Sequence, residues 1–258
     1  RVLFRSHPDF YEQEAAKGGR GDLATLIYTS GTTGDPKGVM LSHGNFLHQT
    51  DYLPGLIGVN PGEIFLSVLP VWHSFERILQ YLILQSGATI AYSKPVGSIL
   101  LADMQAVQPH WFPSVPRIWE SVKDGIYKNI KQSSKVKRVL FRFFVGVGES
   151  FAYFRNHLLG RYPRFSPRNR VLEIVAAIVP FLLLAPLWAL GDILVYKKIK
   201  TKLGKNFIAG VSGGGALPGA VDRFFDAIGV LILEGYGLTE TAPVLGVRLK
   251  THPVIGTV

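Results

Sequence analysis

The sequence contains no cysteine and only two methionines among its 258 residues. The lack of cysteine excludes disulfide scaffolds, thiolate metal sites and cysteine nucleophiles, and it fits a reducing compartment. The chain starts at Arg1 rather than at methionine and stops at Val258 within an apolar run. We therefore expect it to be a piece of a longer protein.

Acidic residues are scarce, and the formal net charge is +10. Between Arg117 and Arg170 there are thirteen lysines or arginines and three acids. A basic block of this kind suits an anionic surface, either phospholipid or nucleic acid. The alternative is a solvated helical face, and the charge alone favours that alternative.

An alternation of strand and helix patterns indicates an α/β fold. Short apolar runs predict strands at 23–28, 63–69, 88–92, 207–212 and 230–233, and helices are expected between them. Apolar residues recur at helical spacing from Phe75 to Ile83, and Gly87 stands where a C-terminal cap belongs. Ser98 is expected to cap the next helix, and Pro218 to open a later one. The pattern predicts layered, mostly parallel sheets flanked by helices.

Residues 123–205 differ from this pattern and are expected to form a basic and apolar helical insertion. Aromatic residues crowd its first half, and the apolar run Ile174–Leu190 follows, interrupted by Pro180 and Pro186. Seventeen residues are at the short end of the roughly 17–25 that cross a bilayer. Basic residues flank both ends, which favours a segment lying in an anionic leaflet. A buried core helix pair is the second interpretation, and a full crossing the third.

The sharpest motif is the string from Tyr28 to Gly38. It places three hydroxyl residues, three glycines and Lys37 in nine positions after a strand. Glycines let backbone N–H groups approach phosphate oxygens, hydroxyls add donors, and lysine adds charge. The string is not a Walker A loop, because Gly34 is followed by Asp-Pro-Lys-Gly. A flexible surface loop is the alternative, which the density of the motif disfavours.

A second motif, Gly235–Thr241, offers parts that suit a magnesium nucleotide. Tyr236 supplies an aromatic face, Gly237 close backbone approach, Thr239 a hydroxyl and Glu240 a hard carboxylate. The alternative interpretation of this second motif is a turn with an exposed acidic residue.

Two further segments are weaker candidates. The glycine turn Ser212–Pro218 leaves room for a flat ligand against its backbone, although a tight strand-to-helix turn needs the same residues. His73 lies in the segment Leu69–Arg77, and a lone histidine beside apolar residues is more often structural.

Together these strings resemble the signatures of the adenylate-forming superfamily, which includes acyl-CoA synthetases, luciferases and peptide adenylation domains. The resemblance implies that the first motif binds the β- and γ-phosphates of ATP, that Tyr236 packs on adenine, and that Glu240 coordinates Mg²⁺. It also implies that His73 lies beside the acyl carboxylate. The segments Trp72–Arg77 and 115–120 resemble the long-chain branch. The implied phosphate-binding and adenine-binding residues are Thr29, Ser30, Gly31, Thr32, Thr33, Gly34, Gly213, Gly214, Gly215, Tyr236 and Gly237, and the implied catalytic residues are Lys37, His73, Thr239 and Glu240.

The resemblance implies a long-chain fatty acid:CoA ligase that uses ATP, Mg²⁺ and CoA. Residues 1–258 would form part of one large adenylation domain without its C-terminal lid, and would be inactive alone. An acyl-carrier protein as acceptor is a close alternative, and an enzyme adenylating aromatic or amino acids is a second. The rival of another class is a catalytically silent, membrane- or fatty-acid-binding protein. We expect a cytoplasmic protein with peripheral membrane contact and no nucleic acid partner.

Overall fold

A six-stranded sheet forms the centre of the computed structural model, which describes residues 9–30, 34–163, 165 and 169–258. Its strand order is β4-β3-β5-β6-β7-β8, and every neighbouring pair is parallel except β7–β8. The strands are β3 (Ile64–Ser67), β4 (Thr89–Tyr92), β5 (Trp111–Ser114), β6 (Ala209–Ser212), β7 (Ile232–Gly237) and β8 (Val244–Val247). The predicted mostly parallel sheet is confirmed.

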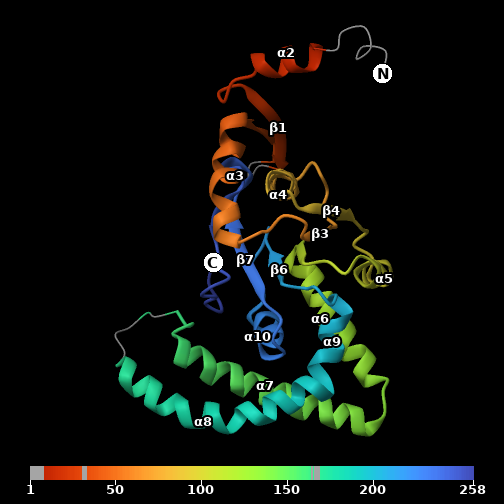
Figure 1. Cartoon of the computed structure of the whole chain (residues 1–258), viewed down its shortest axis with the longest axis vertical. Coiled ribbons are helices and arrows are strands. Elements are labelled where there is room, and N and C mark those ends of the chain that lie inside the picture. Colours follow the sequence, from red (N-terminus) through yellow and green to blue (C-terminus); the bar gives the residue numbers. More distant parts are fainter. Residues whose placement is uncertain (1–8, 31–33, 164, 166–168) are drawn as a thin grey trace.

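Helices cover both faces of this sheet, which gives a three-layered α/β architecture (Figure 1). On one face lie α3 (His43–Ile57) and α4 (Ser74–Gln85). On the other lie α5 (Gly97–Val107), α6 (Pro116–Lys131), α7 (Lys135–Leu159), α9 (Lys197–Leu203) and α10 (Gly219–Ala227). The short helix α2 (Phe10–Lys17) lies at the N-terminal end and buries none of its residues.

Alternation along the strands produces two separate cores. Trp111 points to the α3/α4 face, where it stacks on Phe65 at a centroid distance of 5.6 Å. Its neighbour Phe112 points to the other face and meets Trp119 of α6 edge to face. Successive strand residues point to opposite faces of the sheet, so the sheet separates the two cores.

The predicted insertion lies within one crossover between two hydrogen-bonded strands. β5 and β6 are paired through Ser114 and Ser212, yet residues 115–208 separate them and form α6, α7, α8 (Arg170–Gly191), the π-helix η1 (Asp192–Tyr196) and α9. Figure 1 shows α7 and α8 side by side at the edge of the molecule. The two helices are joined by the stacking of Phe151 on Phe181.

Pro180 and Pro186 do not break the helix, so the interpretation of this run as a buried pair of core helices is wrong. Helix α8 continues through both prolines, and with η1 and α9 it makes one 34-residue helix from Arg170 to Leu203. Each proline removes one backbone hydrogen bond from the helix, but the side chains of Phe151 and Trp188 hold this part against α7 and α10. By length and composition the helix could cross a membrane, and 11% of its apolar window is buried.

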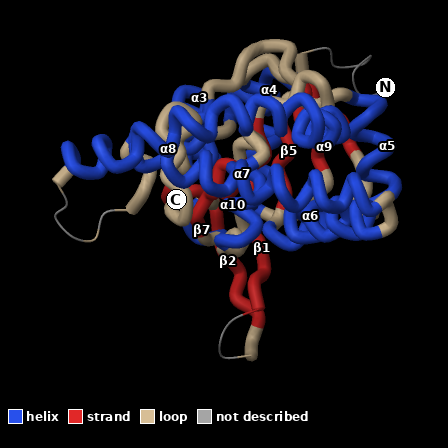
Figure 2. Tube along the Cα trace, turned by 90° about the horizontal axis from the view of Figure 1, so that it is seen from below, coloured by secondary structure: helices blue, strands red, loops and turns tan. Residues whose placement is uncertain are grey.

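A two-stranded antiparallel ribbon projects from the body of the molecule (Figure 2). It consists of β1 (Leu23–Ser30) and β2 (Pro36–Ser42), so residues 28–30 and 36–38 of the string 28–38 lie on two paired strands rather than between a strand and a helix. The predicted cap Ser98 is also wrong: α5 begins at Gly97, and the capping position is Val96.

Candidate nucleotide site

The β1–β2 ribbon carries the described part of the first motif. Thr29 pairs with Lys37 and Ser30 with Pro36, which places the lysine opposite the hydroxyl residues at the tip. Gly34 has a φ of +93°, a conformation that favours glycine, and Lys37 is exposed. The predicted phosphate-binding residues Gly31, Thr32 and Thr33 lie outside the described residues.

The acidic motif lies against this ribbon. Glu240 belongs to the short helix η2 (Thr239–Thr241), which contacts β2. A cavity of about 180 Å³ lies between η2 and the first turns of α3 and is lined by Glu240, Thr241 and residues of α3, with no lining residue from the described part of the ribbon. The two motifs, separated by two hundred residues in the sequence, therefore lie side by side. We call this cavity the η2 cleft.

The first turns of α3 complete the η2 cleft, and sequence reasoning missed them. Gly44, Asn45 and His48 line it, and the positive end of the α3 dipole favours an anion there. The amide nitrogen of Gln49 donates to the carbonyl oxygens of Thr241 (3.1 Å) and Val244 (2.9 Å). Gln49 thus fixes η2 to α3. The only available signal was position, since α3 directly follows β2.

The other predicted site residues gather at the carboxyl ends of the parallel strands, where open α/β sheets bind ligands. His73 follows β3 and caps α4, with its Nδ1 accepting a hydrogen bond from the backbone N–H of Phe75 at 3.2 Å. The Phe75 ring covers Gly213, where an added Cβ would lie 3.1 Å from the ring. The histidine segment and the glycine turn are therefore neighbours.

The glycine turn is buried at Gly213 and exposed at Gly214 and Gly215. The backbone N–H of Gly213 donates to the carbonyl of Ser114 at 3.2 Å, and Gly214 has a φ of +77°. Gly215 lies near the ring of Pro116. Close contact with Phe75 thus explains the glycine at 213 and backbone conformation the glycine at 214, and a ligand role for the three stays a prediction.

The first residues of the second motif, Gly235–Gly237, lie within β7, and its last residues form η2 after the strand. Tyr236 pairs with Gly246 and is exposed, which leaves its ring available for stacking. A Cβ at Gly237 would lie 1.9 Å from the carbonyl oxygen of Pro243, so no side chain fits there without displacing backbone. The close packing of β7 on β8 therefore explains why residue 237 is a glycine.

A buried ionic network ties these segments together, and sequence reasoning missed it. Arg248 contacts the Asp222 carboxylate through two nitrogens at 2.9 and 3.0 Å, and Glu234 at 3.1 Å. The other oxygen of Glu234 accepts a hydrogen bond from the backbone N–H of Leu217 at 2.8 Å. The end of the glycine turn, β7 and α10 are thus joined through one guanidinium group. Nothing in the local spacing of these residues identifies the network.

Glu76 is a second buried group at this edge of the sheet. It is fully buried, its Oε1 accepts hydrogen bonds from Ser67 (2.5 Å) and Gln80 (3.2 Å), and its Oε2 has no partner among the described residues. Burial raises the pKa of Glu76, although the hydrogen bonds from Ser67 and Gln80 lower it. Glu76 was predicted as part of the long-chain signature, and the structure places it in the first turn of α4, buried.

The donor set fits a magnesium nucleotide. Mg²⁺ in proteins is commonly held by one or two carboxylates, waters and substrate phosphates. Glu240 is the carboxylate that lines the η2 cleft, and the part of the chain that the structure describes contains no cluster of three metal-ligating side chains. This site suits a metal ion that is coordinated partly by phosphate oxygens of the nucleotide. It does not suit a metal ion coordinated by protein side chains alone.

Comparison with known proteins finds a matching family model and named relatives. The family model described as "AMP-binding enzyme" matches residues 4–258. A chloroplastic long-chain-fatty-acid–[acyl-carrier-protein] ligase of Arabidopsis thaliana is 40% identical over 92% of this chain and 33% of its own length. Long chain acyl-CoA synthetase 3 of the same plant is 29% identical over 86% of this chain and 30% of its own length.

The solved structures show the same fold. The o-succinylbenzoate coenzyme A synthetase of Bacillus subtilis, in complex with ATP and magnesium ion, matches with a TM-score of 0.55 and 16% identity. The match covers 91% of this chain and 34% of that protein. The chain thus spans about a third of the length of the relatives that it matches.

Proposed function

The chain belongs to the AMP-binding enzyme family, and on that premise we propose that it carries the nucleotide-binding part of a long-chain fatty acid:CoA ligase. The overall reaction would convert a fatty acid, ATP and CoA into acyl-CoA, AMP and pyrophosphate. The observation that supports this proposal is the contact of β2, the second strand of the hairpin, with η2, the short helix that contains Glu240.

Each motif then has a defined part in binding. The hairpin, with Thr29, Ser30 and Lys37, would hold the β- and γ-phosphates. Tyr236 would stack on adenine, and Thr239 would contact the α-phosphate. Glu240 would hold Mg²⁺, which when bound supplies positive charge to the phosphate oxygens. His73 uses Nδ1 to cap α4, which leaves Nε2 for the acyl carboxylate.

The chemical task is to bring two anions together. A carboxylate oxygen attacks the α-phosphorus, the new C–O–P linkage forms, and the bond to the β-phosphate oxygen breaks with release of pyrophosphate. The protein contributes mainly position and charge. Lys37 and the α3 N-terminus offset negative charge, while the rigid glycine turn orients the acid. A thiol then displaces AMP.

We assign residues 1–258 to one large adenylation domain, with 123–205 as a membrane-associating insertion. The thioester step would need a lid region with a catalytic lysine, so residues 1–258 alone would bind nucleotide weakly and would not turn over. Formation of acyl-AMP by this chain alone would contradict that assignment.

A further part of the proposal is which thiol accepts the acyl group. The names of the relatives include both an acyl-carrier-protein ligase and an acyl-CoA synthetase. We propose CoA as the acceptor and acyl-carrier protein as the alternative, with aromatic or amino acids as alternative substrates.

A full-length enzyme should be assayed for pyrophosphate release with acids from acetate to palmitate, and then with CoA or acyl-carrier protein as acceptor. We expect activity to rise with chain length and thioester to form with CoA. Absence of pyrophosphate release with every acid would favour a silent lipid-binding protein instead.

We further propose that α8 lies in the surface of a membrane, on its cytoplasmic side. Apolar side chains of α8 are exposed along its length, including Leu182 (61%) and Leu183 (69%). Helix α7, which packs along α8, carries exposed Arg142 and Glu149. A full crossing would carry these charges into lipid, so a shallow position of α8 is favoured. A chloroplastic location, as in the name of one relative, is the alternative.

Flotation with anionic liposomes tests this position. The double variant Leu182→Asp/Leu183→Asp should reduce liposome binding at least tenfold, because burying each leucine contributes roughly 1.5–3 kcal/mol. Leu84→Asp is the control, since Leu84 is 68% exposed on α4, and it should float like the wild type. Equal flotation of all three proteins would refute membrane contact through α8.

A further inference from the structure

The largest cavity described lies far from the η2 cleft, on the opposite face of the sheet. Its volume is about 760 Å³, within the range of about 300–1,000 Å³ typical of small-molecule sites. Its walls come from α5, α6, the start of α7, η1 and α9. None of its lining residues lines the η2 cleft. We call it the α6–α9 cavity.

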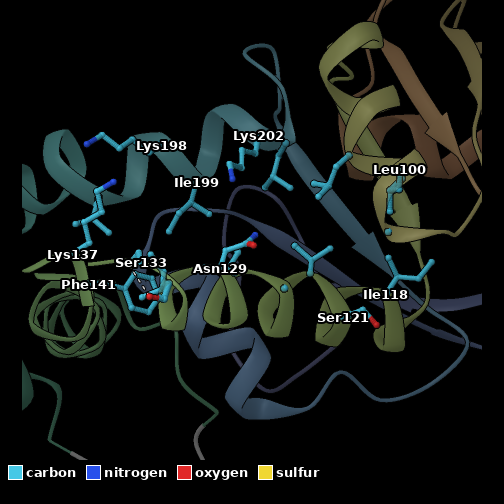
Figure 3. Close-up of a pocket in the computed structure, with 18 of the residues that line it drawn as sticks. Leu100, Ile118, Ser121, Asn129, Ser133, Lys137, Phe141, Lys198, Ile199 and Lys202 are labelled. Atoms are coloured by element: carbon cyan, nitrogen blue, oxygen red, sulfur yellow. Dashed lines mark hydrogen bonds between the residues drawn. The ribbon is translucent and has the colours of Figure 1, made fainter. Parts of the chain in front are cut away.

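The walls of the α6–α9 cavity are apolar over most of their length. Leu100 of α5 and Ile118 of α6 lie at one end, and Phe141 of α7 lies at the other (Figure 3). Asp and Glu are absent from the residues that line it. A cavity of this composition favours an extended apolar ligand, since burying each CH₂ contributes about 0.8 kcal/mol.

Positive charge lies at the α7 end and in the middle of the cavity. Lys137 and Lys198 lie at the α7 end, and Lys202 lies between that end and Leu100, extending from α9 toward α6 (Figure 3). All three lysines are exposed, and within the described residues none forms an ion pair with a carboxylate. The opposite end, near Leu100, has no lysine in its lining. The ligand should therefore be apolar along its length and anionic at one end.

From this asymmetry we propose that the α6–α9 cavity binds one long-chain fatty acid, separately from the activation reaction. The carboxylate lies among Lys137, Lys198 and Lys202, and the chain extends along α6 toward Leu100. The choice of a fatty acid over other single-chain anions rests on the proposed function. The site itself rests on the cavity and its charges.

The position of the cavity suggests how it is filled. Leu194 lines it and is also 41% exposed, and it belongs to the same continuous helix as the exposed apolar side chains of α8. A chain leaving a lipid surface at α8 thus meets apolar side chains up to the cavity. The cavity would therefore store the fatty acid substrate within the enzyme.

One glycine allows a sharp test. Gly125 lines the cavity from the middle of α6, and no atom lies within 4 Å of a Cβ placed there. A leucine at 125 would occupy the cavity without a backbone clash, and helices favour leucine over glycine. Gly146 of α7 is the matched control, since it is helical and exposed, has equally open space, and lies outside the lining.

The experiment is titration of the chain with cis-parinaric acid, a fluorescent long-chain fatty acid, without ATP. We expect saturable binding that Gly125→Leu weakens at least tenfold and Gly146→Leu leaves unchanged. The triple variant K137Q/K198Q/K202Q should weaken the acid about tenfold and leave hexadecanol, which has no charge, unaffected. The matched triple variant K128Q/K131Q/K135Q should bind like the wild type.

Several results would overturn the proposal: no saturable binding, equal binding by the two leucine variants, or equal loss in both. Displacement of the probe by phospholipid vesicles as effectively as by palmitate would assign the cavity to lipid instead. Loss of binding in Lys37→Ala but not in Gly125→Leu would place the acid near the β1–β2 hairpin instead. Pyrophosphate release by the full-length enzyme is measured separately, so failure of the cavity and failure of the proposed function are distinguishable.

Discussion

Two buried glutamates, one just before β3 and one on α4, have pKa values shifted in opposite directions by their neighbours. The Glu63 carboxylate accepts hydrogen bonds from the Asn60 backbone (3.0 Å), the Asn60 side chain (2.8 Å) and Trp111 (2.6 Å). Burial raises its pKa, but these bonds and the nearby His110 outweigh burial, and the pKa lies below 4.5. Glu76 has fewer donors and an unpartnered oxygen, so burial dominates and its pKa lies above 4.5.

The two glutamates should therefore affect stability with opposite dependence on pH. For Glu76 the folded chain binds the proton more tightly, so stability is lost as pH rises from 4.5 through the raised pKa. Glu76→Gln should remove this loss, and from pH 4 to 8 it should gain about 1–3 kcal/mol relative to the wild type. Glu63→Gln should show the opposite trend, because its contribution is present above pH 4.5 and lost below. Urea unfolding across this range measures both, and parallel pH profiles for the two variants would contradict the assignment.

At the scale of elements, one arginine holds the glycine turn, β7 and α10 in place. Arg248 and Asp222 are almost fully buried, so removal of the arginine leaves uncompensated carboxylates in the interior. Arg248→Met should lower the free energy of unfolding by about 3–5 kcal/mol. Arg223→Met on the exposed side of α10 should change it by about 0.5 kcal/mol or less. Denaturant unfolding compares the two, and a loss below about 1 kcal/mol for Arg248→Met would show that the network is not needed.

Elements were predictable from the sequence where local pattern determines them. The strand at 64–67, the helix after His73 and the left-handed Gly87, with φ +64°, all follow from periodicity and turn chemistry. The β1–β2 hairpin was missed, because a strand after the glycine loop depends on pairing with residues 23–30. The unbroken α8 was missed because contacts with α7 and α10 outweigh the two prolines.

At the scale of the whole molecule, the fold class followed from the alternation of elements, and the candidate site followed only in part. Motifs identified Glu240 and Lys37, and the sheet topology then placed the glycine turn beside Phe75. Gln49, Arg248 and the α6–α9 cavity arise from contacts between segments distant in sequence. Such contacts leave no local pattern in one sequence, which is why these features needed the structure.

The central claim is that the β1–β2 hairpin and Glu240 bind the same magnesium nucleotide. Calorimetric titration of the chain with ATP, with and without Mg²⁺, tests it in the wild type, Lys37→Ala, Glu240→Gln and the double variant. Glu149→Gln, an exposed acid on α7, is the control. We expect each single variant to weaken MgATP binding about tenfold, Glu240→Gln to abolish the effect of Mg²⁺, and the double variant to lose less than the sum of the two. Wild-type affinity and wild-type magnesium dependence in Glu240→Gln would contradict the account.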